Sequence, residues 1–73
     1  MDRATTAKAI KLVQERMAEL KQKIRDNERL LSSNDKKVSV RGVQLTLIRL
    51  KDVLQTNEFF YEWLLSDEDH GLH

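Results

Sequence analysis

The side chains best suited to hold a metal ion lie near the carboxyl end of the chain. His70 and His73 are three residues apart, a spacing that places two ligands on one face of a helix, and Asp67 and Asp69 lie beside them. Three or four such groups can hold a divalent metal ion. We expect these residues to form a terminal tail rather than part of a rigid scaffold. The sequence therefore predicts no metal site and no cofactor.

The usual arrangements of a catalytic site are missing from the sequence. There is no Cys nucleophile, no Gly-rich phosphate loop and no Ser, His and acid set on an element expected to be ordered. The lack of Cys also excludes disulfides and thiolate metal sites, and it fits a reducing compartment. We predict that the chain is not an enzyme and has no catalytic residues.

The most distinctive local feature is an aromatic cluster. All the aromatic residues fall within five positions, 59–63, in the order Phe-Phe-Tyr-Glu-Trp. Large aromatic side chains dominate binding hot spots because one rigid group buries much area. The alternative is that the aromatic rings are part of the core and pack against Ala7, Ala9 and Ile10. We predict a protein-binding surface formed by Phe59, Phe60 and Trp63 and supported by Ile48 and Val53.

A group of basic residues near the middle of the chain suggests a different partner, because clustered cations can grip phosphates. Acidic residues are interleaved with this group, and no aromatic residue lies nearby to stack on a base. A solvated charged face is therefore favoured, with a nucleic-acid-binding dimer kept as the alternative. A second alternative is a sponge for a small anionic ligand between subunits, which no motif supports. The basic residues are Arg25, Arg29, Lys36, Lys37 and Arg41.

Two stretches of heptad-like spacing predict the elements that carry these residues. Apolar residues recur at steps of three and four in each half of the chain, which is typical of a helix seam. If the chain folds back near residue 35, the two seams face each other, with Ile24 opposite Leu47 and Met17 opposite Leu54. The first seam comprises Ile10, Val13, Met17, Leu20, Ile24 and Leu31, and the second comprises Val40, Val43, Leu47, Leu50, Leu54, Tyr61 and Leu64.

The fold class predicted is therefore all-α, a single antiparallel two-helix hairpin of coiled-coil type over residues 1–73. The first helix should span about 3–31, the polar turn about 32–38 and the second helix about 39–66. Ser39 or Asp35 is expected to cap the second helix. Residues 67–73 are acidic, the unfavourable sign for a helix carboxyl end, and should form a frayed tail.

The second helix carries more apolar residues than the first helix can cover. Besides its seam it has Leu45, Ile48, Val53, Phe59, Phe60, Trp63 and Leu65, which lie on its flanks and back. A helix that is apolar nearly all round expects burial on more than one side. Soluble monomers rarely keep a large apolar patch exposed. We therefore expect self-association, most simply into a four-helix bundle dimer, and binding of a heterologous protein as adaptor, chaperone or inhibitor.

The chain length, hydropathy and charge agree with a small helical protein. Seventy-three residues bury little surface, so association is the remaining route to stability when disulfides are excluded. No apolar run is long enough to cross a membrane and no signal peptide is evident, so we expect a cytoplasmic protein. The net charge of +1 hides an asymmetry, since residues 1–42 carry +5 and residues 43–73 carry −4. Two such halves lying side by side would partly neutralise each other.

Overall fold

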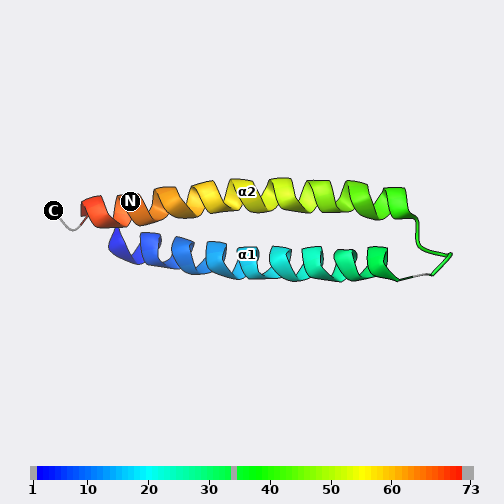
Figure 1. The fold of residues 1–73 in the computed structure, drawn as a ribbon. Helices are drawn as coiled ribbons and strands as arrows, with labels where there is room; N and C mark the ends of the chain where they lie inside the picture. The colour runs from blue at the N-terminus through cyan, green and yellow to red at the C-terminus, as the bar shows by residue number, and fades with distance from the viewer. Residues whose placement is uncertain (1, 34, 72–73) are drawn as a thin grey trace.

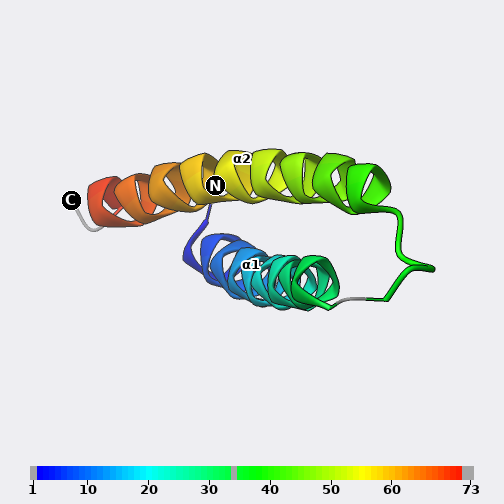
Figure 2. The same ribbon diagram turned by 45° about the vertical axis from the view of Figure 1, so that its right-hand side comes forward.

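The computed structural model describes residues 2–33 and 35–71, with side chains described for 2–33 and 35–66. Over these residues the chain forms two helices, α1 (Arg3–Ser32) and α2 (Val40–Gly71), joined by residues 33–39. The helices run antiparallel along each other (Figure 1), and the turned view shows that their axes are inclined (Figure 2). The molecule measures 57 × 15 × 13 Å. The prediction of an all-α, two-helix hairpin is confirmed.

Short polar side chains cap both ends of α1. Asp2 caps the first turn, since its carboxylate accepts a hydrogen bond from the Thr5 backbone N–H at 2.8 Å. At the other end the Ser33 N–H donates to the carbonyls of Arg29 and Leu30, and the Ser33 hydroxyl donates to Leu30 at 2.7 Å. These contacts satisfy backbone groups that a helix leaves without partners at its ends.

The start of α2 is set by Ser39, one of the two predicted caps. The Ser39 hydroxyl accepts a hydrogen bond from the Gly42 N–H at 3.1 Å. Asp35 instead accepts from the Lys37 N–H at 2.9 Å and so stabilises the turn between the helices. A Cβ atom at position 42 would lie only 3.1 Å from the Ser39 hydroxyl oxygen. Gly42 therefore leaves room for the capping side chain.

The carboxyl end of α2 differs from the sequence prediction. The helix continues to Gly71, beyond the end predicted near Ser66. Acidic residues weaken the last turns of a helix but do not break it, and no Pro or Gly intervenes before Gly71. The helix therefore extends into the residues predicted to form a frayed tail, and the last two of those residues lie outside the described part of the chain.

The core is the predicted seam between α1 and α2. Its most enclosed members are Leu20 and Leu64, which are 1% and 0% exposed. Val13, Ile24 and Leu47 are also buried. The remaining predicted seam residues, other than Val40, are half-buried: Ile10, Met17, Leu31, Val43, Leu50, Leu54 and Tyr61. One face of each helix is thus covered by the other helix.

Two features of the seam depart from simple heptad packing. Val40 was predicted to belong to the seam but is 55% exposed, whereas Val38 from the connecting segment is half-buried. Val40 opens α2 beside the chain reversal, where little of α1 remains to cover it. Asn27 and Asn57 occupy seam positions, and each donates its side-chain amide to the carbonyl four residues earlier at 2.8 Å. Neither amide bonds to a described residue of the other helix.

Neither α1 nor the described length of α2 contains a stretch both long and apolar enough to cross a membrane.

Candidate protein-binding surface

The five residues predicted to bind protein all lie on the solvent-facing side of α2. Ile48 is 65% exposed, Phe59 63% and Trp63 54%, and Val53 and Phe60 are each more than two-fifths exposed. Their positions follow from the register, because Leu47, Leu54 and Leu64 turn the opposite face of the helix toward α1. Among the described residues, the hairpin therefore leaves a second apolar face of α2 without a partner.

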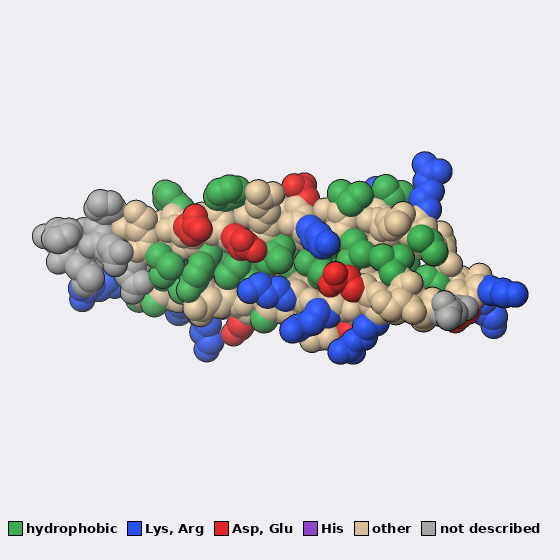
Figure 3. Space-filling model, viewed as in Figure 1, with side chains coloured by type: hydrophobic (Ala, Val, Ile, Leu, Met, Phe, Trp, Pro, Cys, Tyr) green, Lys and Arg blue, Asp and Glu red, His purple; other side chains and the backbone are tan. Residues whose placement is uncertain are grey.

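The aromatic part of this surface is ordered by contacts within α2. The rings of Phe60 and Trp63 stack, with centroids 5.8 Å apart and planes inclined by 16°. Phe59 precedes Trp63 by four residues, which places both on the same side of the helix. The space-filling view shows hydrophobic side chains between the helices and also along the outer edge of α2 (Figure 3). We call the five residues Ile48, Val53, Phe59, Phe60 and Trp63 the α2 outer surface.

Tyr61 belongs to the seam rather than to this surface. It is half-buried, and its hydroxyl accepts a hydrogen bond from the Gln14 side-chain amide at 3.0 Å. This is the one side-chain hydrogen bond between α1 and α2 among the described residues. The aromatic cluster is thus divided, with Tyr61 anchoring α2 to α1 and its three neighbours facing solvent.

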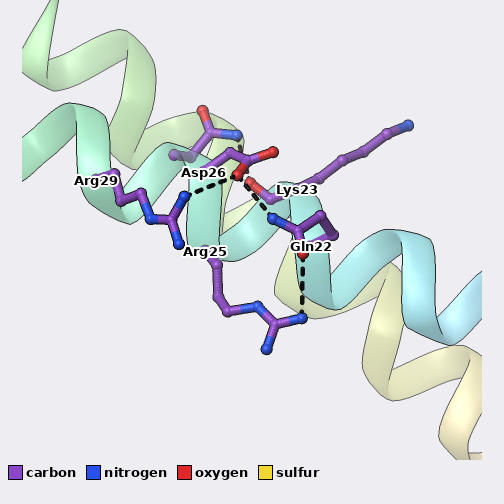
Figure 4. Close-up of polar contacts among 6 residues, drawn as sticks. Gln22, Lys23, Arg25, Asp26 and Arg29 are labelled. Carbon is purple, nitrogen blue, oxygen red and sulfur yellow. Dashed lines mark hydrogen bonds and ion pairs between the residues drawn. The ribbon is translucent and has the colours of Figure 1, made fainter.

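The predicted phosphate-binding residues are exposed but do not form one compact site. Arg25, Arg29, Lys36, Lys37 and Arg41 are spread over α1, the connecting segment and the first turn of α2. Two of them are engaged locally, as the close-up shows (Figure 4). Arg29 pairs with Asp26 at 4.0 Å, and Arg25 donates to Gln22 at 3.3 Å. Gln22 in turn donates to Asp26 at 2.9 Å. These contacts are typical of a solvated charged helix face.

A basic groove runs between the helices on one flank of the seam. Lys21 and Arg25 of α1 and Lys51 of α2 line it, above the apolar side chains of Ile24 and Leu54. No carboxylate lies within 4.0 Å of any of these three cations among the described side chains. The groove is therefore an electropositive feature with an apolar floor.

The Asp2 carboxylate, which caps α1, has a shifted pKa. Its hydrogen bond from the Thr5 backbone N–H holds the pKa of the Asp2 carboxyl below its usual value of 3.8, because that bond favours the ionised form. Asp2 lies directly before α1 and outside the α2 outer surface.

Within the described side chains, no group of three or more His, Asp or Glu residues could hold a metal ion. The His70 and His73 side chains, with Asp67 and Asp69, lie outside that part of the chain.

Thr6, Leu12 and Leu30 were given no place in the predictions from the sequence. Thr6 is 3% exposed and occupies a seam position, with its hydroxyl donating to the Asp2 carbonyl at 2.9 Å. The heptad spacing extended back from Ile10 would have placed it there. Leu12 and Leu30 of α1 are 65% and 44% exposed. Leu45, beside Ile48, is 52% exposed and enlarges the unpartnered apolar area of α2.

The sequence matches no protein-family model, and neither a curated protein nor a solved structure is similar enough to indicate a relationship.

Proposed function

We propose that this chain is a non-enzymatic protein-interaction module, of the adaptor, chaperone or inhibitor kind, which binds other protein surfaces through the α2 outer surface. The observation that carries the proposal is the exposure of all five residues of that surface while the opposite face of α2 is buried against α1. Several large apolar side chains exposed on one side of a helix are typical of an interaction site.

The energetics favour Trp63 as the principal contact. Fully burying one large apolar side chain contributes about 1.5–3 kcal/mol, and Trp63 and its neighbours each expose two-fifths or more of their area. The stack of Phe60 on Trp63 presents two rings in a fixed arrangement, which lowers the entropy lost on binding. Trp is also enriched among residues that dominate binding energies.

The simplest partner is the chain itself. A two-helix hairpin has one internal interface, and small domains of this size gain stability by association. A dimer would form a four-helix assembly and cover the apolar area that α1 leaves open. A heterologous protein would use the same surface and compete with self-association.

Substitution of Trp63 tests the proposal. We expect Trp63→Ala to keep the helical content measured by circular dichroism and to weaken self-association in sedimentation equilibrium by about thirtyfold or more, the loss typical of a hot-spot residue. Leu12→Ala is the matched control, because Leu12 is 65% exposed but lies on α1. If Trp63→Ala lowers only the melting temperature while all association persists, the aromatic cluster is ordinary core and the proposal is wrong.

The basic groove favours a second candidate, binding of an anionic ligand or nucleic acid. Three cations without carboxylate partners among the described side chains line it. Binding of this kind must weaken steeply as salt is raised, whereas an apolar protein interface should change little. Titration of fluorescent duplex DNA and of inorganic phosphate at two salt concentrations separates the two candidates. No binding at the lower salt would exclude the second one.

A further inference from the structure

The outer face of α2 has a pattern of charges that bears on what covers it. Leu45, Asp52 and Phe59 follow one another at intervals of seven residues, so they lie along one line on the face turned away from α1. All three are exposed. Arg41 and Arg49 lie beside the amino-terminal half of this line, Asp52 is at its centre, and Glu62 lies beyond its carboxyl-terminal end. In chain order these charged residues are Arg41, Arg49, Asp52 and Glu62.

These four charges have no partners within the described chain. All are exposed, and no opposite charge lies within 4.0 Å of any of them among the described side chains. Two positive charges are followed by two negative charges along α2. When two copies of α2 run antiparallel, the positive end of each therefore faces the negative end of the other. A second α2 laid antiparallel on the first brings Arg41 opposite Glu62 and Arg49 close to Asp52. A parallel arrangement would place like charges opposite each other.

The apolar residues follow the same symmetry. Leu45 lies seven residues before Asp52 and Phe59 seven residues after it. A two-fold axis that passes through the face at Asp52 therefore places Leu45 of each copy against Phe59 of the other. The contact is isologous, so every favourable pair forms twice. The two Asp52 carboxylates approach the axis, where Arg49 of each copy lies one helical turn away to offset their repulsion.

The surface area of the hairpin leaves room for such an interface. The chain exposes 5879 Å², whereas a compact monomer of 8.6 kDa exposes about 4,700 Å². The excess of about 1,200 Å² exceeds the roughly 800 Å² that each partner buries in a standard interface. Burial of the α2 face in a dimer would bring the exposed area per chain close to that of a compact protein.

We propose that the α2 outer surface is occupied by a second copy of this chain, with α2 antiparallel on α2 about a two-fold axis at Asp52. The two α2 helices form the centre of the dimer and the two α1 helices its outside. This inference rests on the proposed function and assigns the partner, orientation and register of that same surface. Arg41 and Glu62 set the orientation, and the apolar residues of the α2 outer surface supply most of the affinity.

Charge reversal tests the orientation by sedimentation equilibrium of the full chain. Arg41→Glu and Glu62→Arg should each weaken dimerisation by about five- to thirtyfold, because two exposed pairs change from attractive to repulsive. In the double variant both pairs are again oppositely charged, with the signs exchanged. Its dissociation constant should therefore return to within about threefold of that of the parent. Lys11→Glu and Glu15→Arg make the same charge changes on the exposed side of α1 and should leave dimerisation unaltered.

The outcomes separate this inference from the proposed function. If Trp63→Ala weakens association but the single charge reversals do not, or the double variant fails to recover, the surface binds protein and the antiparallel pairing is wrong. If the parent chain is monomeric at millimolar concentration, the second copy is excluded as the occupant. If the parent associates and Trp63→Ala does not alter that association, the proposed function and this inference both fail.

Discussion

Replacement of Leu20 by Ala measures how much of the fold depends on the seam. Leu20 is 1% exposed and lies near the middle of α1, so almost all of its side chain is covered by the seam. The substitution removes buried carbon worth about 0.8 kcal/mol for each methylene and leaves a cavity. The expected cost is about 2.5–4 kcal/mol, below the top of the range for Leu→Ala because a two-helix seam can relax into the space.

That cost is large for a chain of this length. Stabilities of about 0.05–0.15 kcal/mol per residue give roughly 4–11 kcal/mol for 73 residues. Leu20→Ala should therefore remove about a quarter or more of the total. Leu12→Ala is the control on the same helix, because Leu12 is 65% exposed and the change should cost less than about 1 kcal/mol.

Urea unfolding followed by far-ultraviolet circular dichroism measures both variants. Protein concentrations must be equal, since association would link stability to concentration. We expect a clearly lower midpoint for Leu20→Ala and a nearly unchanged midpoint for Leu12→Ala. Equal losses for the two variants would refute the helix packing described above.

Three further predictions concern polar groups. Asp2→Ala should lower the melting temperature at neutral pH, because it removes the cap of α1. Folding depresses the Asp2 pKa, so the stabilisation is fully present above pH 3.8 and is lost as the pH falls through the lower pKa of the folded state. The melting temperatures of the two proteins should therefore converge in acid. Lys21→Glu should stabilise the hairpin by up to about 1 kcal/mol at low salt, and less at high salt, because it replaces a like-charge neighbour of Lys51; a loss of stability in thermal melting would contradict this. Asn57→Leu should raise stability by about 1 kcal/mol, because the Asn57 amide bonds its own helix; a fall would show that it fixes the register.

The hairpin could be predicted from the sequence because the heptad spacing survives almost unbroken along both helices. The spacing placed Leu20, Ile24, Leu47 and Leu64 in the core, and all are buried. The spacing wrongly predicted that Val40 is buried. A repeat pattern describes a continuous seam and does not show where one helix extends beyond the end of the other.

The surface features were only partly predictable. The exposure of Trp63 followed from counting apolar faces on the second helix. The hydrogen bond between Gln14 and Tyr61 depends on how far two long side chains reach across the seam, which spacing alone does not give. The basic groove likewise requires the relative height of the two helices, because its cations come from both of them.

Fluorescence of Trp63 gives the most direct test that the α2 outer surface is an interface. It is the single Trp of the chain and is 54% exposed in the isolated hairpin, so its emission reports on this surface alone. As protein concentration rises through the micromolar range, the emission maximum should move to shorter wavelength in parallel with the mass measured by sedimentation. An increase in mass with Trp63 emission unchanged at the wavelength of a solvated indole would contradict the account.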